Sequence, residues 1–270
     1  MATLGRTVRR GLRFLLGGVV ALLVGGPPLG AAEAPLVAGA ADLQFALTEI
    51  AEAFRKETGS ALTLVFGSSG NFARQIRQGA PFELYLSADE DYVLELARDG
   101  FTKNEGALYA IGRVVLKVPT GSPLSADGSL EDLVRAVRYG RVKRFAIANP
   151  EHAPYGKRAE EVLRHKGIWE EIRPFLVFGE NVSQAAQFAT SGNAQGGIIA
   201  YSLALSPKLK ALGAHALIPA EWHAPLRQRM VLTKKATPVA ERFYAYLQQE
   251  PARPIFRRYG FVLPGEAATD

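Results

Sequence analysis

Short apolar runs alternate with amphipathic stretches along most of this chain, and this alternation restricts the possible folds more than any other feature. The apolar runs have the length of buried strands and cover residues 35–40, 62–66, 83–87, 114–118, 144–148, 175–178, 197–201 and 229–232. The stretches between them have helical spacing and cover residues 43–56, 71–78, 90–99, 130–139, 157–165, 183–191 and 239–249. Strands that alternate with helices of this length indicate an α/β fold with mostly parallel sheets.

Residues 1–32 have the pattern of a secretory signal peptide. Four arginines precede an apolar stretch over residues 14–24, and small residues then lead to a predicted cleavage site after Ala32. A membrane anchor is the alternative, but the apolar stretch is short and interrupted by glycine. Arg9 and Arg10 leave twin-arginine export open beside ordinary secretion. The sequence therefore predicts export to the periplasm.

The charge of the mature chain is small. The full sequence has 32 basic and 26 acidic residues, and the leader holds four arginines and no acid, so the mature chain carries 28 minus 26, or +2. This balance gives no reason to expect nucleic-acid binding. The chain has no cysteine, which excludes disulfides and a lipid anchor on cysteine.

The mature 238 residues (270 minus 32) are enough for one large domain or two medium ones. One sheet of eight strands is possible, but two smaller lobes fit the pattern better. We expect one lobe to comprise residues 33–113 plus 227–270 and the other to comprise residues 114–226. The chain would then cross between the lobes twice, near residues 112–115 and 219–227, and these crossings would act as hinges.

Four predicted strands end in short turns that lead directly into helices. Ligands of α/β folds bind beyond the carboxyl ends of strands, and helix N-termini present unpaired N–H groups to anions. Ser68 and Ser69 add two hydroxyls to one of these turns, although serines at such a place can simply cap the helix. The turns span residues 40–42, 67–70, 149–156 and 179–183. If two lie in each lobe, a cleft between the lobes would bring them together around an anion.

Several motifs, in order along nearly the whole mature chain, resemble those of periplasmic molybdate-binding proteins of ABC importers, which have the type II periplasmic-binding-protein fold. They are Val37-Ala38-Gly39-Ala40-Ala41-Asp42-Leu43, Phe66-Gly67-Ser68-Ser69-Gly70 with Gly79-Ala80-Pro81, Ser87-Ala88-Asp89, Asn149-Pro150-Glu151-His152-Ala153-Pro154-Tyr155-Gly156, Gly197-Ile198-Ile199-Ala200-Tyr201, and residues 256–261. The resemblance implies a monomeric two-lobed clamp that needs no cofactor. It would close on a tetrahedral oxyanion, molybdate or tungstate, and deliver it to an inner-membrane permease.

The resemblance also implies a set of ligand-binding residues. Ser69 matches the serine of the family's second turn, and Val182 matches the residue that donates a backbone N–H from the second lobe. Three positions depart from the family pattern. Asp42, or Ala41 if the match shifts by one, replaces the first-turn serine; Tyr155 replaces a small residue; and Ala200 replaces a tyrosine, with Tyr201 one place later. The candidate ligand-binding set is therefore Ser69, Val182, Asp42, Ala41, Tyr155, Tyr201 and Ser68.

Asp42 is the departure with the clearest physical consequence. A carboxylate about 4 Å from one negative charge costs about 4 kcal/mol at an effective dielectric constant of 20. We therefore expect Asp42 to turn away and cap the following helix, unless the ligand is not a bare dianion. Tyr155 would then restore a hydroxyl from the opposite lobe.

The sequence leaves two other functions open. The ligand could be another oxyanion or a small organic acid. Ser69 could instead be the nucleophile of a hydrolase, with His152 as its base, but the Gly-x-Ser-x-Gly turn that activates such a serine is absent. We expect His152 to order the loop over residues 150–156, and we expect the chain not to be an enzyme.

Overall fold

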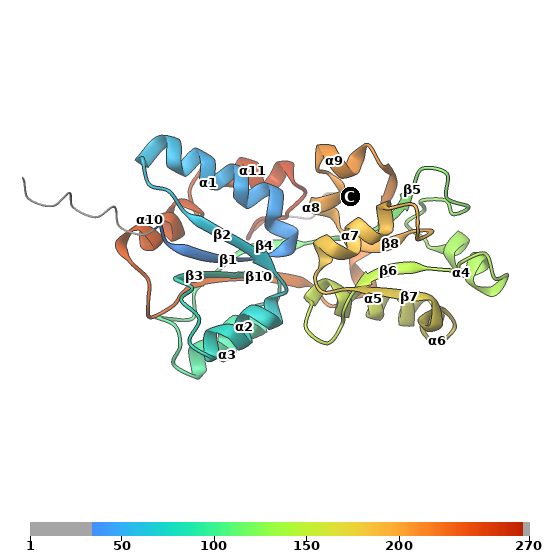
Figure 1. Ribbon diagram of the computed structural model, residues 1–270, viewed down its shortest axis with the longest axis horizontal. Coiled ribbons are helices and arrows are strands. Elements are labelled where there is room, and N and C mark those ends of the chain that lie inside the picture. The colour runs from blue at the N-terminus through green and yellow to red at the C-terminus, as the bar shows by residue number, and fades with distance from the viewer. Residues whose placement is uncertain (1–33, 267–270) are drawn as a thin grey trace, which may run out of the picture. The chain divides into compact units, whose positions relative to one another are not determined.

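The computed structural model describes residues 34–266, so the predicted signal peptide lies outside the described residues. Two five-stranded sheets, each flanked by helices, form two lobes (Figure 1). The first sheet has the order β2-β1-β3-β10-β4 and the second has the order β7-β6-β8-β5-β9. The strands are β1 (Leu36–Ala40), β2 (Thr63–Gly67), β3 (Leu84–Ser87), β4 (Ala107–Gly112), β5 (Val114–Pro119), β6 (Phe145–Ala148), β7 (Leu176–Gly179), β8 (Gly197–Ala200), β9 (Gly213–Leu217) and β10 (Leu226–Leu232). The predicted two-lobed α/β fold is confirmed.

The sheets are mixed rather than mostly parallel, which refines the prediction. In the first sheet β1 pairs in parallel with β2 and β3, whereas β10 runs antiparallel to both β3 and β4. The second sheet repeats this pattern, with β6 parallel to β7 and β8, and β5 antiparallel to β8 and β9. The antiparallel pairs arise where the chain enters a sheet from the other lobe.

Helices cover the faces of both sheets (Figure 1). The longer ones are α1 (Gln44–Thr58), α2 (Ser69–Arg77), α3 (Glu90–Arg98), α4 (Glu131–Arg138), α5 (Pro154–His165), α7 (Val182–Thr190) and α10 (Pro238–Tyr246). The shorter ones are α6 (Trp169–Ile172), α8 (Tyr201–Ala204), α9 (Pro207–Lys210), α11 (Arg253–Arg258) and the 3₁₀ helices η1 (Ala41–Leu43), η2 (Arg173–Phe175) and η3 (Ala220–Trp222). Within residues 34–266 no helix combines the length and hydropathy needed to cross a membrane.

The chain changes sheets at two places. Strand β4 ends at Gly112 in the first sheet and β5 begins at Val114 in the second, so a single residue, Arg113, connects them. The return connection runs from the end of β9 at Leu217 to the start of β10 at Leu226. The first change falls within residues 112–115, which the sequence suggested as a hinge, and the second overlaps the suggested range 219–227. The lobe boundaries themselves, and hinge motion at these connections, stay predictions.

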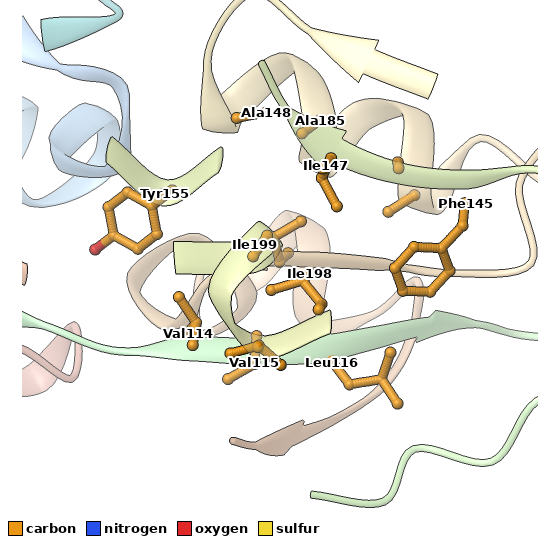
Figure 2. Packing of buried hydrophobic residues seen from close by; sticks show 14 of the residues in the cluster. Val114, Val115, Leu116, Phe145, Ile147, Ala148, Tyr155, Ala185, Ile198 and Ile199 are labelled. Carbon is orange, nitrogen blue, oxygen red and sulfur yellow. The ribbon is translucent and has the colours of Figure 1, made fainter. Parts of the chain in front are cut away.

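Each lobe has its own hydrophobic core. In the second lobe, apolar side chains from β5, β6 and β8 pack on both faces of the sheet, with Ala185 of α7 and Tyr155 of α5 in the same cluster (Figure 2). The cluster reaches Ala40 and Ala88 of the first lobe. In the first lobe, neighbouring residues of one strand belong to opposite faces: Val37 packs with Leu84 and Leu86, whereas Ala38 packs with Tyr85. This alternation is the period of two that a strand covered on both faces requires.

Candidate functional site

Two strand ends in each lobe bring the four predicted turns to one place. In the first sheet β1 and β2 are parallel and in register, so that Ala40 lies beside Gly67. In the second sheet β6 and β7 are also parallel, and Ala148 lies beside Gly179. Helices η1 and α1 follow β1, α2 follows β2, α5 follows β6 and α7 follows β7. Four helix N-termini therefore lie at the carboxyl edges of the two sheets.

Residues from all four turns line one small cavity with a volume of about 10 Å³, which is the space of roughly one water-sized sphere. Its lining residues are Ala40, Ala41, Asp42, Gly67, Ser68, Ser69, Ala88, Ala153, Pro154, Tyr155 and Val182. Six of the seven candidate residues are among them. The structure thus brings together side chains and helix ends that are far apart in the sequence.

Tyr201, the seventh candidate, lies elsewhere. It is the first residue of α8, and it lines a larger cavity of about 530 Å³ together with Arg113 and Arg257. Ala200, the gapless match to the family tyrosine, ends β8 and is fully buried in the core of the second lobe. The structure thus places Tyr201 outside the small cavity, where Tyr155 is the one tyrosine among the lining residues.

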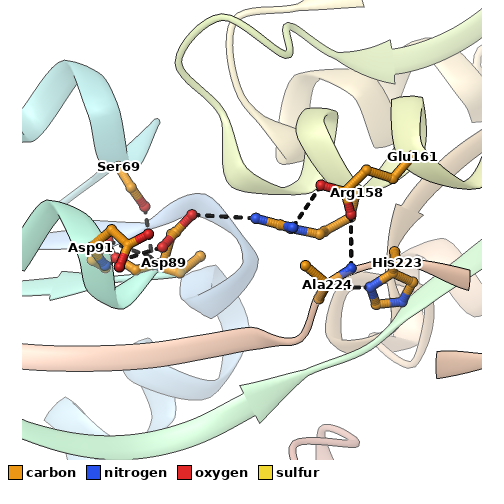
Figure 3. Close-up of polar contacts among 9 residues, drawn as sticks. Ser69, Asp89, Asp91, Arg158, Glu161, His223 and Ala224 are labelled. Atoms are coloured by element: carbon orange, nitrogen blue, oxygen red, sulfur yellow. Dashed lines mark hydrogen bonds and ion pairs between the residues drawn. The ribbon is translucent and has the colours of Figure 1, made fainter. Parts of the chain in front are cut away.

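Ser69 keeps its hydroxyl hydrogen available to the cavity. Its Oγ, which Figure 3 shows, accepts a hydrogen bond from the Ala88 N–H at 3.0 Å. Its backbone carbonyl accepts one from the Tyr85 hydroxyl at 2.8 Å. A serine hydroxyl can accept and donate at the same time. These contacts fix the serine at the first position of α2 and leave its O–H free to donate to a ligand.

Ser68 is used differently, because it joins the lobes. Its Oγ lies 2.5 Å from the carbonyl oxygen of His152 and 2.9 Å from Nδ1 of the same residue. The Gly70 N–H donates to that carbonyl at 3.0 Å. A Cβ on Gly70 would lie 2.7 Å from the carbonyl oxygen, so only glycine permits this approach. His152 thus joins its loop to the α2 turn, and its ring contacts Ser68 instead of Ser69.

Val182 is the first residue of α7, and its side chain is buried. The side chain of Asn181 caps this helix by accepting from the N–H groups of Ser183 and Gln184 at 3.0 Å each. The first N–H groups of a helix have no partner inside it. The Asn181 side chain pairs with the N–H groups of Ser183 and Gln184, so the N–H group of Val182 remains for a ligand in the cavity.

Asp42 is held by a hydrogen-bonded network that joins both lobes. Its Oδ2 accepts from Nε2 of Gln228 on β10 at 2.6 Å and from the hydroxyl of Tyr155 on α5 at 3.0 Å. The Tyr109 hydroxyl donates to Oε1 of Gln228 at 2.7 Å, which fixes the amide. Asp42 is only 1% exposed, and within residues 34–266 its Oδ1 has no hydrogen-bond partner. The prediction that Asp42 caps the next helix is wrong, because neither η1 nor α1 has a side-chain cap.

Burial dominates the electrostatics of this network. Desolvation raises the pKa of Asp42 from 3.8 to about 6, although hydrogen bonds from Gln228 and Tyr155 act in the opposite direction. Burial and the nearby Asp42 raise the pKa values of the Tyr155 and Tyr109 hydroxyls well above their usual range. The cavity therefore contains an acid that holds its proton more tightly than an exposed aspartate does.

Residues 35–262 match the family model of the bacterial extracellular solute-binding proteins. The chain belongs to this family. It is 37% identical to the molybdate-binding protein of Rhodobacter capsulatus, over 92% of this chain and 96% of that protein. It is 34% identical to the molybdate-binding protein of Azotobacter vinelandii, over 84% of this chain and 89% of that protein.

A solved structure agrees with the sequence relatives. The periplasmic molybdate-binding protein of Azotobacter vinelandii superposes with a TM-score of 0.76 at 31% identity, covering 85% of this chain and 99% of that one. The match spans both lobes, so this solute-binding protein shares its two-lobed architecture with that protein.

Gln228 and Tyr109 belong to the hydrogen-bonded network around Asp42 in this solute-binding protein, and the sequence did not reveal them. The pairing of β10 with β4 moves from Gln228–Ala110 to Arg229–Leu108, so Tyr109 is the extra residue of a β-bulge. Bulges commonly re-aim a side chain beside a site. A Cβ on Gly112 would lie 2.4 Å from the Tyr155 hydroxyl and 2.7 Å from Nε2 of Gln228, so the last residue of β4 must also be small.

Charged side chains also join the lobes of this solute-binding protein (Figure 3). Asp89 in the first lobe lies 3.4 Å from Arg158 on α5, and Arg158 donates to Glu161 at 2.7 Å. Glu161 in turn accepts from the Ala224 N–H at 2.8 Å, on the return connection between the sheets. This series of contacts links Asp89, which follows the cavity-lining Ala88, to the return connection between the two sheets. In residues 34–266 no group of three acidic, histidine or cysteine side chains is placed to hold a metal cation.

Proposed function

We propose that this protein captures a tetrahedral oxyanion, molybdate or tungstate, in the cavity between its lobes and delivers it to an ABC permease. One observation carries the proposal: four helix N-termini converge on one cavity, where the Ser69 hydroxyl and the Val182 N–H have hydrogens to donate. Two relatives with more than 30% identity are named for molybdate binding, which selects molybdate among oxyanions.

Neutral donors can hold such an anion for a physical reason. Each helix N-terminus carries a partial positive charge, and hydrogen bonds are stronger where water is excluded. The proposed ligand-binding residues are Ser69, Val182, Ala41 and Asp42. Tyr155 lines the same cavity and holds Asp42 through its hydroxyl, and Ser68 joins the lobes beside them. The cavity volume of about 10 Å³ is smaller than an oxyanion needs, so the lobes must separate slightly or adjust to accept one.

We further propose that the lobes move as a clamp. The first lobe would comprise residues 33–113 and 227–270, and the second would comprise residues 114–226, with hinges at the two crossings. Hydrogen bonds between the lobes support this, because Ser68, Asp42 and Gln44 contact His152, Tyr155 and Ser183 respectively. X-ray scattering with and without molybdate should show a change in the radius of gyration.

The remaining features follow from the same proposal. The protein would work in the periplasm as a monomer without a cofactor, after removal of a signal peptide that ends at Ala32, and would not bind nucleic acid. It would bind its ligand without transforming it. The Ser69 hydroxyl supports this view, because it contacts Ala88 and not the His152 ring that a serine hydrolase would use as a base.

A thermal-shift screen followed by calorimetry tests the function. Molybdate and tungstate should raise the melting temperature of the mature protein by mass action, and sulfate, phosphate and small carboxylates should do so less. Ser69→Ala should weaken molybdate binding about 10- to 100-fold, because a hydrogen bond to a charged ligand contributes about 1.5–3 kcal/mol.

The control is Ser191→Ala at the exposed end of α7, where Oγ donates to the Phe188 carbonyl away from the cavity. It should bind molybdate as the unsubstituted protein does. If no oxyanion stabilises the protein, or if Ser69→Ala binds as tightly as the control, the proposed site is wrong.

A further inference from the structure

The two oxygens of the Asp42 carboxyl group have different surroundings. Oδ2 accepts two hydrogen bonds, from Gln228 and Tyr155, which occupy its lone pairs. Oδ1 has no partner among the described residues, although Asp42 is 1% exposed and lines the cavity with Ser69 and Val182. A buried polar atom without a partner is unfavourable, so this oxygen is the part of the group that a ligand would satisfy.

The polar groups nearest to Asp42 compensate a negative charge only in part, because burial raises its pKa more than the hydrogen bonds from Gln228, Tyr155 and the backbone N–H groups of Asp42 and Leu43 lower it. Its titratable neighbours are the hydroxyls of Tyr155 on α5 and Tyr109 on β4, and both stay protonated because burial raises their pKa values. Three further elements pack on the Asp42 turn. Among them α7 and β2 contain no charged residue, and α8 contributes only the hydroxyl of Tyr201 as a titratable group.

The cations on nearby elements are engaged elsewhere. On α5, Arg158 pairs with Asp89 and Glu161, and Lys157 lies over the ring of Tyr92. On β10, the two arginines beside Gln228 both pair with Glu90. The charged residues of α1 begin at the exposed Glu49, about two turns beyond Asp42. An ionised Asp42 would therefore face a bound anion without a cation between them.

We propose that Asp42 binds the oxyanion as a neutral carboxylic acid, so that this protein takes up one proton with each anion. The inference rests on the function proposed above and concerns the same cavity. The proton comes from solvent and forms one O–H bond at Oδ1, because Oδ2 already accepts two hydrogen bonds. Asp42 then donates from Oδ1 to an oxygen of the anion, as the serine hydroxyl expected at this turn would do.

The protonation state has a direct consequence for affinity. Only the protein fraction with a neutral Asp42 is competent, and the apparent dissociation constant rises as this fraction falls. Burial places the pKa of Asp42 at about 6. Molybdate affinity should be nearly constant below this pH and then fall about tenfold for each pH unit above it.

Calorimetry on the mature protein tests the inference. Molybdate is titrated between pH 5 and pH 8 in pairs of phosphate-free buffers with different ionisation enthalpies, which gives the number of protons taken up. We expect about one proton per anion near pH 8 and about none at pH 5. Sulfate, which stays a dianion over this range, is a second probe and should show the same pH dependence.

Asp42→Asn is the matched variant. Its amide can accept from Gln228 and Tyr155 with its oxygen while its nitrogen donates at the place of Oδ1. It should take up no proton. Near pH 8 it should bind molybdate about 100-fold more tightly than the unsubstituted protein, because pH 8 lies two units above the Asp42 pKa of about 6. Asp99→Asn, at an exposed carboxylate that pairs with Arg77, is the control and should keep the proton uptake.

The outcomes separate the inference from the proposed function. Molybdate binding without proton uptake and with one affinity at every pH would overturn the inference and leave the function intact. Phosphate binding without proton uptake, together with no binding of molybdate or sulfate, would also overturn it, because Asp42 would then accept a proton that the ligand carries. If neither the unsubstituted protein nor Asp42→Asn binds any oxyanion at any pH, both the function and the inference fail.

Discussion

Two neighbouring turns of the first lobe have nearly the same backbone setting and opposite chemistry. Both follow adjacent parallel strands, β1 and β2, and both lead into a helix at the same edge of the sheet. The β2 turn presents Ser69, a neutral donor whose hydroxyl hydrogen faces no competitor. The β1 turn presents Asp42, an acid that is fully buried and bonded to the opposite lobe.

The difference shows that the position of a turn and the charge of its side chain are separate determinants of an anion site. The fold brings helix N-termini to the cavity whatever the side chains are. The side chain then decides whether the turn donates at every pH, as Ser69 does, or only when it is protonated, as we propose for Asp42. Substitutions at Ser69, Asp42 and Tyr155 exchange or weaken these two properties.

The largest effect should come from giving the β2 turn the chemistry of the β1 turn. Ser69→Asp would place a second acid in the cavity, without the hydrogen bonds that Gln228 and Tyr155 give to Asp42. One negative charge about 4 Å from another costs about 4 kcal/mol at an effective dielectric constant of 20, or roughly a thousandfold in molybdate affinity. Calorimetry at pH 7.5 measures the loss.

The control for that prediction is Ser69→Asn, which has a similar shape and no charge. It should lose much less affinity than Ser69→Asp, and circular dichroism should show that both variants fold. Equal losses in the two variants would mean that shape, and not charge, controls the β2 turn.

A smaller effect is expected on the stability of the ligand-free protein. Folding raises the pKa of Asp42 from 3.8 to about 6, so the folded state holds this proton more tightly than the unfolded chain does. The resulting stabilisation is complete below pH 3.8 and is lost as the pH rises through about 6. The loss amounts to about 3 kcal/mol, from 1.36 kcal/mol for each pKa unit.

Urea unfolding of the ligand-free protein measures this effect. Asp42→Asn should gain stability relative to the unsubstituted protein by up to about 3 kcal/mol between pH 4 and pH 7.5. Asp99→Asn should show no such gain. A difference between Asp42→Asn and the unsubstituted protein that does not change with pH would show that Asp42 is not buried in the ligand-free state.

The smallest effect should come from Tyr155→Phe, which removes one of the two hydrogen bonds that stabilise the Asp42 carboxylate. Such a bond contributes about 1 kcal/mol. Its loss should raise the pKa of Asp42 further, because the hydrogen bond from Tyr155 lowers it. The midpoint of the molybdate affinity profile should therefore move to higher pH, as calorimetry across pH 5–8 would show. A shift to lower pH would contradict the assigned direction of this bond.

The sequence predicted the elements that have a clear period and missed those that lack one. Strands β1, β2, β6 and β8 and helices α1, α3 and α7 lie close to their predicted ranges. Strand β4 was missed because only Arg113 separates it from β5 and its bulge at Tyr109 interrupts the alternation. Strand β9 was missed because it is a short edge strand that contains Gly213 and His215.

The sequence by itself determined the α/β class and the four strand-to-helix turns, because these depend on local periodicity and on short-range turn chemistry. It could not determine the chemistry around Asp42. Gln228 lies 186 positions away along the chain and Tyr155 lies 113 positions away, and no local pattern marks either as a partner. Only tertiary structure brings them to one carboxyl group and removes water from it, and burial is what turns an ordinary aspartate into an acid that can keep its proton.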